Sequence, residues 1–232
     1  MADSSSSDRS LPLILLALTA GTGIVDAVSF LGLGRVFTAN MTGNVVFLAF
    51  AAAGAADLSV PRSLAALAGF FAGAVVGGRF ATRMGASSRR RWISTALVVE
   101  TGLLLAATAS AIGFQEAGQP TPAALYAVII LTALAMGVRN ATVRKLGVAD
   151  LTTTVLTLTV AGLAADSSLA GGGNYNLFRR VGSVVMMFGG AVVGALLLKH
   201  SLVLPLIVCS AISGLAATAV LLGATKEVAR AR

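Results

Sequence analysis

The sequence predicts an all-α polytopic membrane protein with six transmembrane helices and two short re-entrant or half-membrane helices, arranged as two inverted-topology repeats. Composition, repeated apolar segments and an internal repeat lead to this fold class. The chain has 232 residues, of which 56% are hydrophobic and only 11% are charged, whereas ordinary soluble domains are roughly 25% charged. The lipid bilayer is therefore the expected main partner of its surface.

Eight apolar segments follow one another along the chain. A helix needs roughly 17–25 apolar residues to cross the hydrocarbon core of a bilayer, and six of the segments approach or reach that length. The long segments cover residues 11–33, 64–82, 92–114, 122–138, 181–198 and 202–223, and the short ones cover residues 40–56 and 152–165.

Two sequence matches indicate that the second half of the chain repeats the first. Residues 71–77, FAGAVVG, are identical at six of seven positions to residues 188–194, FGGAVVG. Upstream, residues 23–27, GIVDA, match residues 137–141, GVRNA, at nearly the same offset. Each half then contains three spans and one short segment. Chance similarity between helices rich in Ala, Gly and Val is the alternative.

The positive residues select a topology, because Lys and Arg close to spans favour the cytoplasmic side. If both short segments re-enter and the N-terminus is inside, all of the 17 positive residues except Arg35, Arg62 and Lys199 are cytoplasmic, Arg139 among them. If all eight segments span, the count divides 7 to 10 and selects no orientation. We therefore expect a multi-pass protein of the bacterial cytoplasmic (inner) membrane with both termini cytoplasmic. Its expected parts are a disordered N-terminus (1–10), inverted repeats (11–116 and 117–224) and a basic tail (225–232).

Polar residues open both short segments, TANMTGN at 38–44 and DLTTT at 150–154. Asn, Asp and Thr are good N-cap residues. A helix that begins near mid-membrane directs its remaining N–H groups and its positive dipole end at whatever occupies the cavity. Ordinary capping of helices at the interface is the alternative. The expected substrate-binding residues are Asn40, Thr42, Gly43, Asn44, Thr152, Thr153, Thr154 and Thr157.

Two acids lie well inside apolar spans, Asp26 and Glu100. An ionised carboxylate at the centre of a span costs about 2.5–3.5 kcal/mol, so such residues indicate a function by default. Each is a candidate proton carrier, because burial favours the neutral acid. Arg139, near the end of its span, is a candidate partner for one of them. An ion pair that only joins helices is the alternative.

Glycines recur at four-residue spacing in both halves, at Gly69, Gly73 and Gly77 and again at Gly190 and Gly194. This spacing makes a flat strip on one face of a helix, which lets another backbone approach closely. Helix packing is the expected role of these glycines, and sliding of helices along the strip is the alternative.

Four blocks carry a family resemblance: DAVSF at 26–30, GRVFTANMTGN at 34–44, GVRNA at 137–141 and LTTTVLT at 151–157. They resemble the YoaK-like family of uncharacterised bacterial integral membrane proteins, from Leu11 to about Gly223. The resemblance implies about six spans and brings no established substrate. Arg139 departs from the pattern, because an uncharged residue is expected there.

These features favour a membrane transporter or channel for a small polar or anionic solute, with proton coupling through Asp26 or Glu100. The alternative is a non-transporting lipid-binding, regulatory or assembly factor that uses its arginine-rich cytoplasmic face and anionic lipids. Enzymatic activity, a cofactor and a metal site are not expected, because the sequence has one histidine, one cysteine and no HExxH, GxSxG or P-loop motif. Nucleic acid is not an expected partner, and a homo-oligomer is compatible with the sequence.

Overall fold

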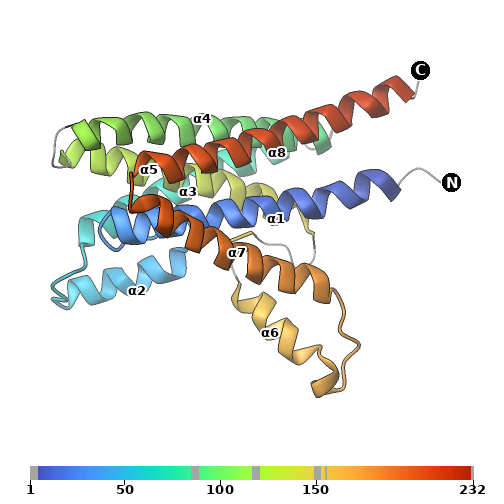
Figure 1. Cartoon of the computed structure of the whole chain (residues 1–232), viewed down its shortest axis with the longest axis horizontal. Coiled ribbons are helices and arrows are strands. Elements are labelled where there is room, and N and C mark those ends of the chain that lie inside the picture. Colours follow the sequence, from blue (N-terminus) through green and yellow to red (C-terminus); the bar gives the residue numbers. More distant parts are fainter. Residues whose placement is uncertain (1–4, 85–88, 117–120, 149–152, 155, 231–232) are drawn as a thin grey trace.

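The computed structural model describes residues 5–84, 89–116, 121–148, 153–154 and 156–230 (Figure 1). Within these residues every regular element is a helix. The six long helices are apolar enough to cross a membrane. In chain order the helices are α1 (Ser5–Ala27), the π-helical η1 (Val28–Gly32), α2 (Met41–Ala52), α3 (Val60–Met84), α4 (Arg89–Glu116), α5 (Pro122–Leu146), α6 (Thr157–Ala165), the 3-10 helix η2 (Ser168–Ala170), α7 (Leu177–Leu198) and α8 (Val203–Arg230).

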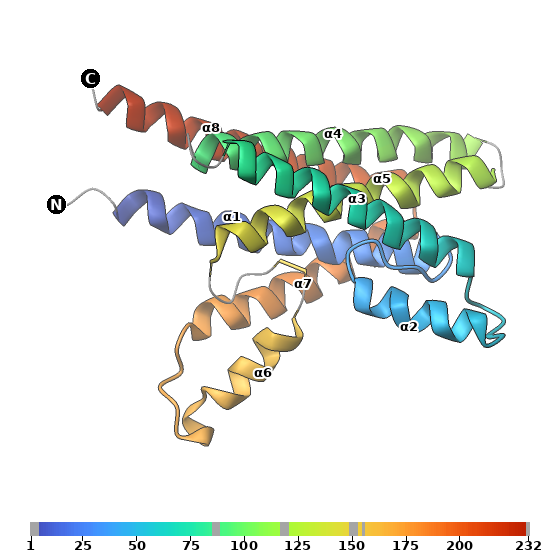
Figure 2. The same cartoon turned by 180° about the vertical axis from the view of Figure 1, so that it is seen from behind.

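The long helices run side by side, and the start of α1 and the end of α8 lie at the same end of the bundle, called the terminal end below (Figures 1 and 2). The two short helices begin nearer its middle and run outward in opposite directions. Helix α2 runs toward the end opposite the termini, whereas α6 runs toward the terminal end and away from the bundle (Figure 1). The expectation of six long helices and two short ones is therefore confirmed.

Long helices of one half of the chain pack on long helices of the other half. Helix α3 packs against α5, and α1 packs correspondingly against α7. The contact of α4 with α5 has its counterpart in that of α8 with α1, and α4 and α8 pack against each other. Each short helix packs on the span that follows it, α2 on α3 and α6 on α7. The principal contacts of the long helices among the described residues therefore fall into corresponding pairs.

Glycines occupy the points at which the exchanged helices cross. A Cβ added to Gly73 of α3 would overlap the carbonyl group of Leu134 in α5, and one added to Gly137 of α5 would overlap that of Phe70 in α3. The second crossing is built in the same way. There, Gly190 of α7 faces the carbonyl of Ala20 and Gly23 of α1 faces that of Met187, while Gly69, Gly77 and Gly194 lie against the same partner helices. Small residues allow this approach of two backbones in a membrane.

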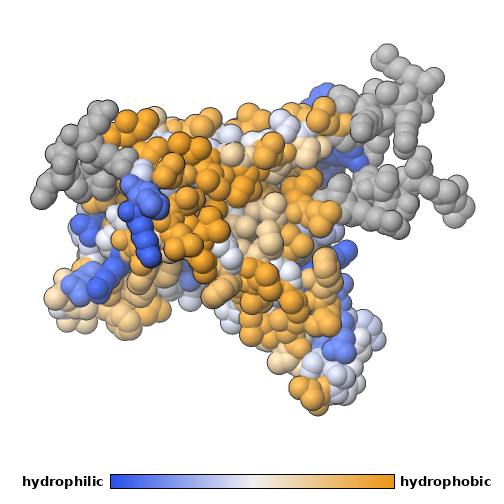
Figure 3. Space-filling model, viewed as in Figure 1, coloured by the Kyte–Doolittle hydropathy of each residue, from blue (hydrophilic) through white to orange (hydrophobic). Residues whose placement is uncertain are grey.

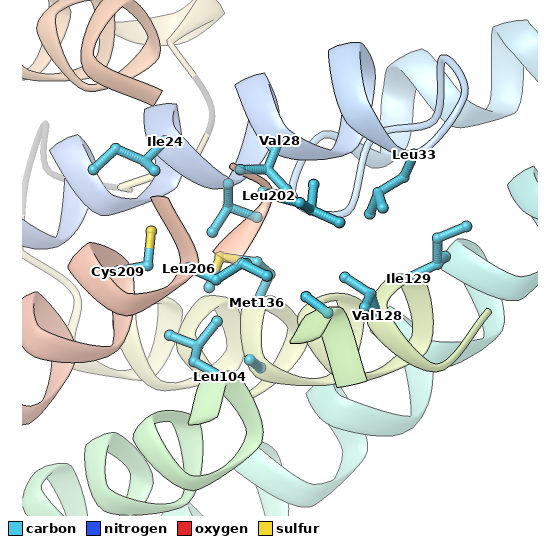
Figure 4. Close-up of a cluster of buried hydrophobic side chains, with 14 of the residues drawn as sticks. Ile24, Val28, Leu33, Leu104, Val128, Ile129, Met136, Leu202, Leu206 and Cys209 are labelled. Carbon is cyan, nitrogen blue, oxygen red and sulfur yellow. The ribbon is translucent and has the colours of Figure 1, made fainter. Parts of the chain in front are cut away.

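The interior is apolar and lies mainly between α1, α4, α5 and α8. Figure 4 shows Ile24 of α1 and Val28 of η1 with Leu104, Met136 and Leu206 from α4, α5 and α8 in one buried cluster. A second buried cluster surrounds Trp92. Outside, apolar side chains cover the middle of the bundle and hydrophilic ones gather toward its ends (Figure 3). This distribution suits a protein whose middle is surrounded by lipid.

Two helix ends differ from the expected spans. Helix α1 begins at Ser5, before the expected start at residue 11. Helix α5 begins after the N-cap Thr121 and continues to Leu146, well beyond the expected end at residue 138. Arg139 therefore lies within the helix and is buried in the bundle, and not at the end of a span as the count of positive residues assumed.

Candidate functional site

A charged pair lies inside the bundle, between Arg139 of α5 and Glu100 of α4. The two side chains are 1% and 0% exposed. One terminal nitrogen of Arg139 donates to Glu100 Oε1. The other donates to the Leu18 carbonyl at 2.8 Å and to Thr22 Oγ1 at 2.9 Å. A hydroxyl of α8, Ser213 Oγ, donates to the same Oε1 at 2.6 Å. The pair therefore joins α1, α4, α5 and α8 at one point.

The hydrogen bonds of this pair are unevenly distributed. Glu100 Oε1 accepts from Arg139 and Ser213, whereas Glu100 Oε2 is buried and has no partner among the described residues. The Nε atom of Arg139 is likewise buried and without a partner there. A buried acceptor without a partner is costly and rare in native proteins. These two atoms are the polar groups of the pair that have no hydrogen-bond partner among the described residues.

A cavity adjoins the pair and extends toward the terminal end of the bundle. Its walls come from α1, α4 and α5 and are apolar except at Glu100, Arg139 and Thr142. The space open to the centre of a water molecule is about 10 Å³, which is close to what one bound water needs. The lining residues are Leu11, Ile14, Leu15, Leu18, Ile93, Ala96, Leu97, Glu100, Arg139, Thr142, Val143 and Leu146.

Asn44 holds the chain segment that precedes α2. Its Oδ1 accepts from the Phe37 backbone N–H at 2.9 Å, and its Nδ2 donates to the Phe37 carbonyl. The side chain is fully buried, so it fixes the backbone of Phe37 and is not free to bind a solute. Gly43 leaves room for the Phe37 ring, which a Cβ would approach to 2.9 Å. The ring also stacks on Phe30 and Phe47.

The first turn of α2 has a capped N–H group and an exposed threonine. Asn40 is the N-cap, and its side chain accepts from the Gly43 N–H at 3.3 Å. Thr42 is exposed on the first turn. Behind this turn, the hydroxyl of Thr38 and one carboxylate oxygen of Asp26 are buried without a partner among the described residues. The backbone of Ala39 lies beside that carboxyl group. Asp26 therefore faces the chain that enters α2.

The second half has a corresponding arrangement. Asn140, the counterpart of Asp26, accepts from Thr154 Oγ1 at 2.5 Å, so it also faces the chain that enters a short helix. Thr153 is buried, its hydroxyl has no partner in the described part of the chain, and its φ is +60°. A β-branched residue seldom adopts that conformation, and such strain concentrates at functional sites. Thr157 is exposed on the first turn of α6, and Thr152 lies outside the described residues.

A second ion pair, not anticipated from the sequence, fastens α6 to α7. Arg180 lies in the first turn of α7 and donates to the Gly162 carbonyl at 2.6 Å and to Asp166 Oδ2 at 2.6 Å. The guanidinium occupies the space that a Cβ of Gly162 would need. From the sequence, Arg180 is counted only among the cytoplasmic positive residues. The four-residue separation of Gly162 and Asp166 carries no signal that could have revealed the pair.

The structure thus divides the expected site residues into three groups. Glu100 and Arg139 come together, and Asp26 is not part of that pair. Asp26 instead accompanies Asn40, Thr42 and the other residues of the α2 opening. A third group, around Thr153, Thr154 and Thr157, forms the α6 opening. Sequence reasoning missed Thr22 and Ser213, because single hydroxyls in apolar spans commonly bond to their own helix.

Replacing Asn44 with alanine should lower the free energy of unfolding by about 1–3 kcal/mol, because the N–H and carbonyl of Phe37 would lose their partner. Thermal unfolding in detergent measures this effect. Asn40→Ala is the matched control in the same turn, since the loss of one N-cap bond costs about 1 kcal/mol. Equal losses in the two variants would show that the Phe37 clamp adds nothing beyond capping.

Six long apolar helices around a buried ion pair define a polytopic α-helical membrane protein. Residues 14–220 match a family described as a protein of unknown function (DUF1275), and the chain belongs to this family. It is 39% identical over 164 residues to the UPF0700 transmembrane protein YoaK of Bacillus subtilis (strain 168), an alignment that covers 69% of this chain and 68% of that protein. No solved structure matches the chain.

Proposed function

We propose that the protein is a transporter or channel for a small polar or anionic solute. The observation that carries this proposal is the placement of α2 and α6, which begin nearer the middle of the bundle and run toward opposite ends (Figure 2). Half-length helices with inward N-termini offer N–H groups and a positive dipole end to a solute. In transporters, such helices occur at the interface of two inverted repeats.

The equivalence of the two halves supports the inverted arrangement. Helix α1 runs away from the terminal end and α5 runs back toward it (Figures 1 and 2). The corresponding spans α3 and α7 likewise run in opposite directions, and each packs on the first span of the other half. Two halves related in this way present their short helices from opposite sides of the membrane, as alternating access requires.

The distribution of exposed charge supports an orientation with both termini in the cytoplasm. Positive side chains gather where α3 ends, α4 begins and α5 ends, which is the terminal end of the bundle (Figure 2). By the rule that Lys and Arg favour the cytoplasmic side, this end faces inward in a bacterial inner membrane. The exposed residues concerned are Arg79, Arg83, Arg89, Arg91, Arg144 and Lys145.

Solute flux into proteoliposomes tests the proposal, with chloride, nitrate, urea and glycerol as solutes. Thr42→Val and Thr157→Val each remove an exposed hydroxyl from the first turn of a short helix. We expect each variant to reduce flux by about two- to tenfold, the value of one hydrogen bond. Thr82→Val is the control, because Thr82 is exposed on α3 and donates to its own helix. Equal flux in all three variants and the native protein would exclude these openings as the solute site.

The exposed cations at the terminal end favour one alternative function, a non-transporting protein that binds anionic lipids. Arg89 is partly engaged there, since it donates to the Leu146 carbonyl at 3.2 Å. This alternative would gain support if no solute enters the proteoliposomes while anionic lipid stays bound to the purified protein. Loss of that lipid on neutralisation of Arg79, Arg83 and Arg144 would locate its site.

A further inference from the structure

The Glu100–Arg139 pair has the features of a binding site that is currently closed by its own carboxylate. Arg139 remains held on one side by the Leu18 carbonyl and Thr22. Its counter-charge comes from Glu100 alone among the described residues. The second carboxylate oxygen, Glu100 Oε2, is buried without a partner, and both residues line the cavity. A proton that reaches Oε2 would therefore leave Arg139 positioned but without a counter-charge.

We propose that Glu100 and Arg139 form a proton-coupled site for a small monovalent anion, in which a proton on Glu100 and an anion on Arg139 bind together. A proton from water forms the O–H bond on Oε2, and the anion takes over the guanidinium group that the carboxylate releases. No net charge is then added to the interior. The inference narrows the proposed function to proton-linked anion handling, but binding at this site does not require transport.

The size and charge of the site determine the class of ligand. The cavity has room for about one water molecule, which favours the smallest anions, such as a halide, over a dicarboxylate or an organic phosphate. One guanidinium group balances one negative charge. A buried charge is tolerated only when it is paired, so a divalent anion would leave an uncompensated charge among apolar side chains.

The residues that line the cavity lie between the pair and the terminal end of the bundle. They extend from Leu11, Ile93 and Leu146 to the level of Leu18, Glu100 and Arg139, a rise of about 10 Å at 1.5 Å per residue. Arg89 lies at the Leu146 end of this lining, bonded to the Leu146 carbonyl. An exposed cation there raises the local concentration of anions.

Among the described residues that line the cavity, Glu100 is the one carboxylic acid. Helix α5 contributes Arg139, and α8 contributes Ser213 and the thiol of Cys209, which donates to the Gly21 carbonyl at 3.2 Å. Helix α1 contributes only the hydroxyl of Thr22 and the Leu18 carbonyl. Asp26 makes no interaction with the pair in the described structure. Because the carboxylate and the anion compete for one guanidinium, each bound anion should be accompanied by one proton. By the same coupling, binding of the proton should strengthen binding of the anion.

Thermal unfolding of the protein in lipid nanodiscs tests the site, with chloride or nitrate compared with gluconate at equal ionic strength. For the native protein we expect chloride to stabilise increasingly as the pH falls, with about a tenfold gain in apparent affinity per pH unit. Chloride addition to weakly buffered protein should cause equimolar proton uptake. Glu100→Gln should be stabilised by chloride at every pH without proton uptake. Asp57→Asn, which removes an exposed acid, should behave like the native protein.

The double variant Glu100→Gln with Arg139→Gln separates an anion site from a structural pair, because it removes both charges together. We expect it to fold and to show no chloride effect. Chloride stabilisation in this variant, or none in the native protein at any pH, would overturn the proposal. If Glu100→Gln alone fails to fold in either salt, the comparison of the native protein with the double variant still decides. None of these measurements depends on solute flux.

Discussion

Arg139→Leu should lower the free energy of unfolding by about 3–5 kcal/mol in gluconate buffer, because the Glu100 carboxylate would then lie inside the bundle without a counter-charge. Glu100→Leu should have a similar effect, since it leaves the guanidinium uncompensated. Exchange of both residues for leucine should recover most of the loss, because hydrophobic replacement of a whole buried pair is often neutral. Thermal unfolding of the four proteins in detergent forms a double-mutant cycle that measures the coupling.

The exposed pair of Arg35 and Asp57 is the matched control. Its atoms are 2.9 Å apart, but the two side chains are 54% and 70% exposed, and such pairs contribute only about 0–1 kcal/mol. Arg35→Leu should therefore change the unfolding temperature little. Two results would contradict this account of the Glu100–Arg139 pair. One is a loss of stability in Arg139→Leu as small as that in Arg35→Leu, and the other is a double leucine variant that loses as much stability as the two single variants combined.

Gly73→Ala should destabilise the protein by about 1–3 kcal/mol, the usual effect of overpacking a closely packed contact. The added methyl group would overlap the Leu134 carbonyl, and backbone cannot move aside as a flexible side chain can. Gly190→Ala should behave in the same way at the second crossing, where the obstacle is the Ala20 carbonyl. Thermal unfolding and the yield of folded protein both measure the effect.

Each of these glycines has a neighbour that serves as its control. A Cβ on Gly78 or Gly189 would meet no atom within 4 Å, so Gly78→Ala and Gly189→Ala should be neutral or gain up to about 1 kcal/mol from helix propensity. Stability that falls equally at crossing and control positions would mean that glycine is needed for the helices themselves. Close approach of two backbones would then not be its role.

The helices could be predicted from the sequence because the bilayer imposes a length and a composition on every span. The expected segment 92–114 lies within α4, and 40–56 contains α2. The end of α5 could not be predicted in this way. By the usual rule, Arg139 marks the end of a span. Only its three-dimensional pairing with Glu100, 39 residues earlier in the chain, shows that it lies inside the bundle.

The polar residues of the candidate site could be predicted from the sequence, but their hydrogen-bond partners could not. Buried acids and polar helix openings are visible in a sequence, since both are expensive in a membrane. The bond that Asn44 makes to Phe37 depends on how residues 33–40 fold back, and the partners of Thr154 and Arg180 depend on how α6 leaves the bundle. Residues of similar polarity therefore have different roles, some fixing the backbone and others remaining available.

The glycine-lined crossings have a consequence for how the chain assembles. The first span of each half packs on the second span of the other half, so neither half alone covers the face of its own first helix. This exchange of helices between the two halves resembles the exchange between subunits in a domain-swapped dimer. A break between α4 and α5 would leave two fragments that need each other. The interface, and not the connecting loop, would hold them together.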